Sequence, residues 1–206
     1  ELIKRRMYGT WSLPGRANKS KSQASLNFKE GYSEAFVKYE DPEVIRDLIR
    51  VRDEGCFSCP FGCSKRSRIK DPEYPSTTKG PEHESMALLG SNCGLGDMED
   101  ICRANYLCNE LGMDTITTGT MISCAMELYE EGYLLEKDLG YPLEFGNTNM
   151  FKLLKQIAHR EGIGDLMAEG GIAFAAKYGH PELFMGIKGI GIQAWHKSGN
   201  ASSSES

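Results

Sequence analysis

Three cysteines lie within eight residues of one another, Cys56, Cys59 and Cys63, in the spacing C-x2-C-x3-C. Glycine and proline residues interrupt the same segment, so it favours a loop that can turn back and aim several thiolates at one point. Several converging thiolates are what an iron–sulfur cluster requires of a protein. The spacing therefore predicts an iron–sulfur site to which this loop gives three ligands.

Two other interpretations of these cysteines stay open. Zinc sites usually combine two C-x2-C pairs, or a cysteine pair with a histidine pair, and the sequence holds no second C-x2-C pair. The three thiols could also be free. Lys65, Arg66 and Arg68 follow directly, and their positive charge would favour thiolate over thiol. The remaining cysteines are scattered and are expected to be buried core residues. Cys93 lies near the candidate site, so a direct contact with that site is the alternative for this residue.

The order of helical signals predicts an all-α, multihelical and irregular fold with long loops. Residues 1–40 lack periodicity and are expected to form an irregular lead-in segment, with a loop over 16–25. Residues 41–195 are expected to form the helical domain, and residues 196–206 a disordered, Ser-rich tail or a truncation point.

Within the helical part, Asp41 with Pro42 predicts a helix start, and this helix is expected to end near Gly55. Residues 56–80 are expected to be loop because prolines recur there. Asp97 predicts a further helix start, and Asp114 or Thr115 predicts the next. Two more helices are expected from about residue 147 and over 166–178, and residues 186–194 are expected to be extended.

Composition narrows the class of protein. The chain has 206 residues, 26% of them charged, and a formal net charge of −5, which argues against a nucleic-acid partner. No apolar run reaches the roughly 18–20 residues that cross a bilayer, so no membrane partner is expected. No secretion signal is visible, and a cytoplasmic location is the default expectation.

Seven collinear blocks then carry a resemblance to a known family. They are C-F-S-C-P-F-G-C (56–63), G-P-E-H-E (80–84), L-G-S-N-C-G-L-G-D (89–97), N-E-L-G-M-D-T-I-T-T-G (109–119), A-M-E-L-Y-E-E-G (125–132), H-R-E-G-I-G-D-L-M-A-E-G (159–170) and G-H-P-E-L (179–183). From about residue 8 to 195 the chain resembles the aldehyde:ferredoxin oxidoreductases, specifically their helical domain 2 and the start of domain 3.

The resemblance implies cofactors and partners. A tungsten, or molybdenum, ion is held in that family by two pterins, and a [4Fe–4S] cluster passes electrons to ferredoxin. Cys56, Cys59 and Cys63 match three cluster ligands, and the fourth would lie beyond Ser206. The N-terminal and C-terminal domains of such an enzyme would also lie outside this chain.

The resemblance also implies roles for single residues. Glu84 matches a carboxylate beside the metal, which could move a proton while water attacks an aldehyde; without the resemblance it would be taken as an exposed or helix-capping acid.

The pterin-contacting pattern D-x-x-G-L-D falls on Asn109, Gly112, Met113 and Asp114. Asn replaces the first Asp and keeps only its ability to accept hydrogen bonds. Asp114 could equally be only a helix cap.

Two departures from the family pattern have consequences. Arg103 and Tyr106 stand where some members carry an E-x-x-H metal bridge between subunits, so no such bridge is expected. Residues 194–199 read A-W-H-K-S-G in place of P-A-Y-D-P-R-G, and His196 in this segment is expected to be a surface residue.

The expected function is oxidation of small aldehydes to carboxylates as part of a tungsten–pterin enzyme. Three alternatives remain: a benzoyl-CoA reductase-like enzyme of the same family, an inactive helical domain that binds zinc or no metal, and an electron-transfer subunit that meets its pterin domain on another chain. The isolated chain is expected to be inactive.

Overall fold

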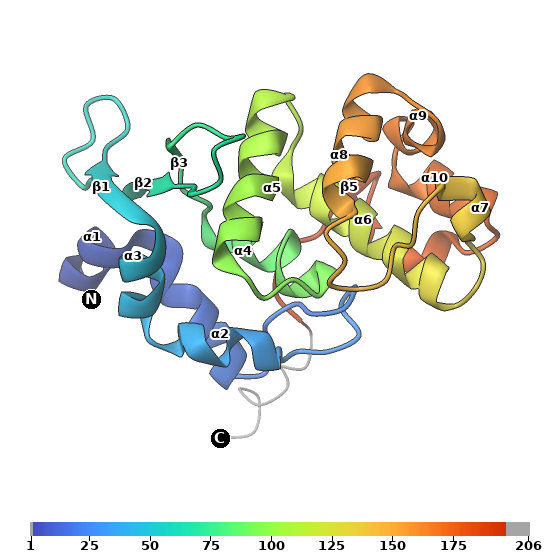
Figure 1. Ribbon diagram of the computed structural model, residues 1–206. Coiled ribbons are helices and arrows are strands. Elements are labelled where there is room, and N and C mark those ends of the chain that lie inside the picture. The colour runs from blue at the N-terminus through green and yellow to red at the C-terminus, as the bar shows by residue number, and fades with distance from the viewer. Residues whose placement is uncertain (1, 197–206) are drawn as a thin grey trace, which may run out of the picture.

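The fold is predominantly helical, as expected, with two small sheets (Figure 1). The computed structural model describes residues 2–196, so the predicted tail over 196–206, apart from its first residue, lies outside the described residues. The helices and strands, in chain order, are α1 (Leu2–Tyr8), η1 (Gly9–Ser12), α2 (Leu13–Lys19), η2 (Glu34–Glu40), α3 (Pro42–Ile49), β1 (Arg50–Glu54), β2 (Ser64–Arg68), β3 (Thr77–Lys79), α4 (His83–Leu88), η3 (Ser91–Cys93), α5 (Met98–Glu110), α6 (Thr115–Glu130), α7 (Glu136–Leu139), α8 (Met150–His159), α9 (Ile163–Ala168), α10 (Gly171–Lys177), η4 (Pro181–Leu183), β4 (Gly186–Ile187) and β5 (Ile190–Gly191).

The first 40 residues are not an irregular lead-in, and this expectation was wrong. They contain α1, α2 and two 3-10 helices, and α2 occupies part of the loop predicted over 16–25. The reason is tertiary: Trp11 is 2% exposed and donates its indole N–H to the Pro81 carbonyl at 2.8 Å. Gly15 lets α2 lie directly against the Glu40 backbone, where a Cβ would come within 2.4 Å of Glu40 Cα. Short helices of weak periodicity are stabilised in this region by burial.

A three-stranded antiparallel sheet replaces the predicted loop over 56–80 and the end of the helix that precedes it. Asp41 caps α3 as expected, since its carboxylate accepts the Glu43 N–H at 3.0 Å. The helix then ends at Ile49 rather than near Gly55, and the chain continues as β1, in the order β1-β2-β3. These strands carry charged rather than alternating apolar side chains, so the usual strand signal is missing.

The centre of the molecule is built on α5 and α6, whose predicted caps are confirmed. Asp97 accepts the Glu99 N–H at 2.7 Å, and Asp114 accepts the Thr117 N–H at 2.7 Å. Both helices contribute to one hydrophobic core that runs through the molecule. At Gly119 the backbone of α4 lies so close that a Cβ would meet the Leu88 carbonyl at 2.7 Å. Helix α4 is thereby held against α6.

The C-terminal half contains shorter and more numerous helices than predicted. The helix expected over 166–178 is two helices, α9 and α10, separated at Gly170, whose φ of +114° is open to glycine but strained for other residues. The extended stretch expected over 186–194 is confirmed in part as the β4–β5 hairpin. No helix among residues 2–196 has the length and apolar composition needed to span a membrane.

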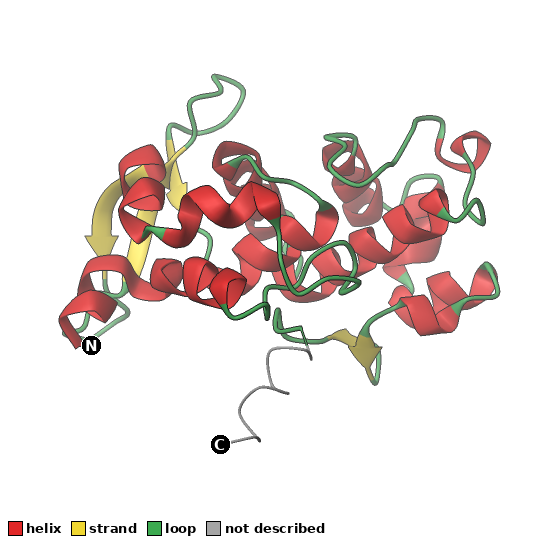
Figure 2. Ribbon diagram, turned by 90° about the horizontal axis from the view of Figure 1, so that it is seen from below, coloured by secondary structure: helices red, strands yellow, loops and turns green. Residues whose placement is uncertain are grey.

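The elements are spread along one long direction. The three-stranded sheet and α1 to α3 lie at one end, and α7 to α10 lie at the other, with α5 between them (Figure 1). Figure 2 shows the same separation of the sheet from the small β4–β5 hairpin. The last described residues return to the N-terminal part, where Trp195 pairs with Gln23.

Candidate functional site

Glu84 is positioned through a hydrogen bond to its carboxylate and through contacts that hold the start of its helix. It lies in the first turn of α4, and its Oε2 accepts the backbone N–H of Ala194 at 2.7 Å. Ala194 is in turn fixed by its own carbonyl, which accepts the Ala24 N–H at 3.1 Å. Thr10 holds the start of α4, because its hydroxyl accepts the His83 N–H at 2.9 Å and donates to the Glu82 carboxylate. Residues from three distant parts of the chain thus orient one half-buried carboxylate.

Glu84 and Asn109 line the same cavity, which has a volume of about 320 Å³. Most of the residues that line it are of polar types: Lys79, Gly80, Glu82, Glu84, Ser85, Asn105, Asn109, Thr115 and Ile116. Its wall is tied together by hydrogen bonds, from Asn105 Nδ2 to the Lys79 carbonyl at 3.0 Å and between the hydroxyls of Ser85 and Thr115 at 2.9 Å. The cavity therefore offers a carboxylate, amides and hydroxyls that could bind a polar molecule.

The rest of the predicted pterin-contacting pattern does not line this cavity. Gly112 forms the turn after α5 with a φ of +70°, and Met113 packs against the hydrophobic core. The Asp114 carboxylate caps α6. The structure brings Asn109 to Glu84 and gives the other three residues of the pattern structural roles.

All three cysteines of the predicted cluster are exposed on the loop between β1 and β2. The loop turns sharply, since the Cys59 N–H donates to the Cys56 carbonyl at 2.9 Å. The sulfurs are not gathered: within residues 2–196, no three His, Cys, Asp or Glu side chains converge closely enough to hold a metal ion. The structure places the three thiols on one loop without forming a metal-binding geometry.

The basic residues after the cysteines form contacts that join the sheet to neighbouring segments. Lys65 is buried, at 2% exposure, and its Nζ donates to the carbonyls of Arg6 and Gly62 at 2.9 and 3.2 Å. It also lies 3.3 Å from the Asp53 carboxylate. The hydrogen bond from Arg50, followed by the charge of Lys65, holds the pKa of Asp53 below its usual value.

Arg66 pairs with Glu54 at 3.5 Å, and Arg68 donates to backbone carbonyls at the end of α3. These three side chains were predicted to favour thiolates; in the structure they fasten the base of the loop.

The other four cysteines are buried, as expected. Burial raises the pKa of the Cys102, Cys108 and Cys124 thiols to about 12 and also raises that of Cys93. The Cys93 thiol donates to the Leu88 carbonyl at 3.2 Å and does not line the cavity beside Glu84. These thiols are core residues.

The burial of His83 was not predicted from the sequence. Its side chain is 1% exposed, and neither ring nitrogen has a hydrogen-bond partner among the described residues. Burial lowers its pKa to about 4, so the ring is neutral near pH 7. The ring lies against Trp195, with centroids 5.1 Å apart. In the sequence His83 stands between two glutamates in G-P-E-H-E, and this charged surrounding gives no indication that the ring is buried.

Comparisons with known proteins agree with one another. A family model described as aldehyde ferredoxin oxidoreductase, domains 2 & 3, matches residues 2–203. The tungsten-containing aldehyde ferredoxin oxidoreductase of Pyrococcus furiosus is 39% identical over 196 residues, which is 93% of this chain and 32% of that protein. Its counterpart in Thermococcus kodakarensis is 37% identical over 195 residues, with the same coverage.

A solved structure, the active site complex BamBC of benzoyl coenzyme A reductase with 1,5 dienoyl-CoA, shares the fold. Its TM-score is 0.72 at 21% identity, over 92% of this chain and 29% of that one. The chain spans about a third of the length of the curated relatives it matches.

Proposed function

This chain belongs to the aldehyde ferredoxin oxidoreductase family, and from that premise we propose that it works within an enzyme that oxidises small aldehydes to carboxylates. The enzyme would carry a tungsten–pterin group and a [4Fe–4S] cluster, and would pass electrons to ferredoxin. Further domains of the enzyme would lie outside the 206 residues of this chain. The relatives that are 37–39% identical to this chain over the aligned residues are named for aldehydes, ferredoxin and tungsten.

One observation supports this proposal most directly. Glu84 and Asn109 belong to two different sequence blocks, and they line one cavity. A site that combines a proton-accepting carboxylate with amide and hydroxyl groups suits a reaction in which water is activated beside a polar cofactor.

The residues present fit the proposed groups by their chemistry. Asn109, Asn105 and Ser85 offer hydrogen bonds of the kind that a pterin can accept and donate. Cys56, Cys59 and Cys63 would supply thiolates to the cluster. When bound, the tungsten–pterin group would take up the two electrons of the oxidation.

Glu84 would take part in proton transfer from water, and it would not carry the electrons of the oxidation. Oxidation of an aldehyde by water gives a carboxylic acid, two protons and two electrons. The Glu84 carboxylate would take one proton from the attacking water through Oε1, while Oε2 stays on the Ala194 N–H. That hydrogen bond fixes the direction of the carboxylate, and positioning of this kind is what makes a general base effective.

The test uses the full-length enzyme that carries this chain, purified without oxygen. We expect about four iron atoms and one tungsten atom per polypeptide, and aldehyde oxidation with a viologen dye as the electron acceptor. Glu84→Gln should lower kcat by about 10²- to 10⁴-fold at unchanged metal content. Glu161→Gln, which removes an exposed carboxylate elsewhere on the chain, is the matched control. Zinc in place of iron, no metal, or a fully active Glu84→Gln enzyme would contradict the proposal.

Ring reduction of benzoyl-CoA is the second candidate, because the BamBC complex shares the fold. At 21% identity that likeness extends to the fold alone, whereas the aldehyde enzymes are nearly twice as similar in sequence. An enzyme that reduces benzoyl-CoA and leaves aldehydes unchanged would favour this second function.

A further inference from the structure

The charge of the chain is distributed unevenly. Residues 1–70 hold 15 Lys and Arg against nine Asp and Glu, whereas the remaining residues hold nine against 20. The basic part folds into α1 to α3 and the strands β1 and β2, which are joined by the cysteine loop (Figure 1). An acidic protein thus has one basic end, and that end holds the candidate cluster ligands.

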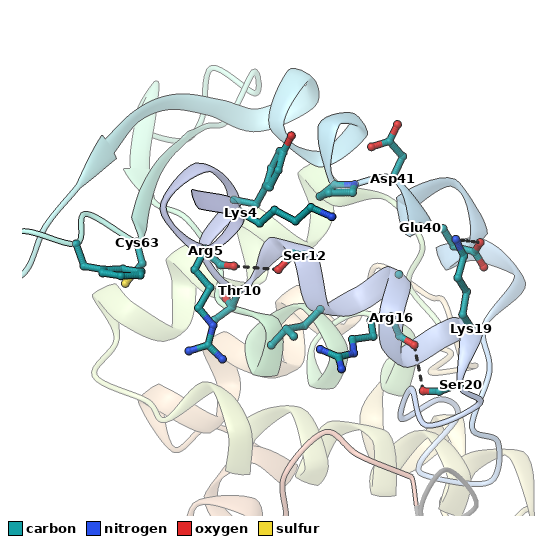
Figure 3. A pocket seen from close by; sticks show the side chains of 16 residues that line it. Lys4, Arg5, Thr10, Ser12, Arg16, Lys19, Ser20, Glu40, Asp41 and Cys63 are labelled. Atoms are coloured by element: carbon teal, nitrogen blue, oxygen red, sulfur yellow. Dashed lines mark hydrogen bonds and ion pairs between the residues drawn. The ribbon is translucent and has the colours of Figure 1, made fainter. Parts of the chain in front are cut away.

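A groove of about 1,070 Å³ follows this basic end. Lys4 and Arg5 from α1 and Arg16 and Lys19 from α2 line it, and it reaches the cysteine loop at Cys63. Figure 3 shows these four basic side chains among the residues that line the groove.

Two carboxylates at the far end of the groove are already engaged. Glu40 pairs with Lys19 at 3.3 Å, and Asp41 caps α3. Lys4, Arg5 and Arg16 form no ion pair with any residue of the described range, so their charge faces the groove uncompensated.

Helix α1 is fastened to the cysteine loop. The buried Lys65 joins the Arg6 carbonyl to Gly62 in the loop. Gly9, at the end of α1, lies so close to the loop that a Cβ there would come within 2.2 Å of the Cys63 carbonyl oxygen. The basic groove and the candidate cluster loop therefore keep a fixed distance from each other.

Large apolar side chains are exposed on the same end. Phe57, in the cysteine loop, is fully exposed, Ile3 is 75% exposed, and Met7, Leu48 and Val51 are about two-fifths exposed. Aromatic and apolar anchors within a polar rim are typical of protein–protein interfaces.

We propose that this basic face, formed by α1, α2 and the cysteine loop, is the docking surface for a small acidic electron carrier of the ferredoxin kind. The proposal rests on the proposed function, which releases two electrons per aldehyde and so needs two molecules of a one-electron carrier. Complementary charge steers such a partner to the surface. Weak electron-transfer interfaces are small, below about 1,200 Å² in total, and a groove beside the cluster loop suits one. The partner then lies next to the residues that would hold the cluster.

Charge reversal in the full-length holoenzyme tests the surface. Lys4→Glu and Arg16→Glu change one residue on each helix, and Lys155→Glu makes the same charge change on α8, at the other end of the molecule (Figure 1). With purified ferredoxin at low salt, we expect KM to rise about five- to tenfold for each groove variant and to stay unchanged for Lys155→Glu. The difference should shrink at about 0.5 M salt, where charges are screened. The rate with a small viologen dye should not change.

Two results would overturn the docking proposal. One is an unaltered KM for ferredoxin in both groove variants. The other is a fall in the dye-linked rate or in iron content, which would mean that the face is covered by another part of the enzyme.

Calorimetric titration of the same proteins with ferredoxin measures binding without turnover. Wild-type protein that binds ferredoxin through the groove but oxidises no aldehyde would refute the proposed function and leave the docking surface standing.

Discussion

Lys65→Met should loosen the cysteine loop without changing any cysteine. The Lys65 ammonium group is buried and joins three structures: the end of α1 through the Arg6 carbonyl, the cysteine loop through the Gly62 carbonyl, and β1 through Asp53. Methionine fills nearly the same space but donates no hydrogen bond, so the two carbonyls lose their partner.

The expected cost follows from these contacts. A hydrogen bond from a charged donor contributes about 1.5–3 kcal/mol, and an unsatisfied buried acceptor costs a similar amount. The contact with Asp53 adds less than about 1 kcal/mol, because that carboxylate is 40% exposed and also pairs with Arg50. Apolar burial of the methionine offsets part of the loss. We expect the sheet and loop to be destabilised by about 2–4 kcal/mol.

Hydrogen exchange measures this local effect. Opening that becomes easier by 2–4 kcal/mol should speed exchange at the β1 and β2 backbone amides by about 30- to 1,000-fold. The amides of α6 at the centre of the molecule should keep their protection. Lys70→Met, which replaces an exposed lysine just beyond β2, is the control and should exchange like the wild type. Equal exchange in Lys65→Met and Lys70→Met would refute the role assigned to Lys65.

Two further predictions concern the α4 region. In the unfolded chain His83 takes up a proton below its ordinary pKa of 6.5, whereas burial lowers the pKa of the ring in the folded protein to about 4. The unfolded state is therefore favoured increasingly as pH falls from 6.5 to 4, and the wild type should lose about 3 kcal/mol of stability over that range. His83→Phe should remove this loss, and denaturant titrations at several pH values would show it; parallel pH profiles for both proteins would contradict it. Gly119→Ala places a methyl group 2.7 Å from the Leu88 carbonyl and should cost about 1–3 kcal/mol. Because α4 carries Glu84, the rate of aldehyde oxidation should fall together with the stability. An unchanged melting temperature would show that α4 and α6 can move apart without cost and would contradict this prediction.

Local sequence was sufficient where a helix begins at its own cap. Asp41, Asp97 and Asp114 were predicted as caps, and each accepts a backbone N–H of the following turn. Such contacts join residues two or three positions apart, so they depend little on the rest of the fold.

Sequence reasoning failed where long-range contacts decide the structure. The strands β1 and β2 are joined by charged pairs such as Asp53 with Lys65, which give no apolar alternation to read. The first helices depend on Trp11 reaching Pro81, a contact between segments 70 positions apart.

In the candidate site, too, local features could be predicted from the sequence, whereas features that depend on long-range contacts could not. Family blocks indicated Glu84 and Asn109 separately, but their shared cavity depends on how α4 packs against α5 and α6. The hydrogen bond from Ala194 and the burial of His83 had no local signal. Asp114 kept the capping role that its position predicted, since a cap needs only the next turn.

The hydrogen bond between Ala194 and Glu84 has a consequence for biosynthesis. The two residues are 110 positions apart, and Ala194 is also paired with Ala24 near the start of the chain. At about 5–20 residues per second, a ribosome would add Ala194 about 5–20 s after Glu84. A nascent chain can therefore form α4 early and still lack the amide that orients its carboxylate. The orientation of Glu84 is among the last features of this part of the chain to be completed during translation.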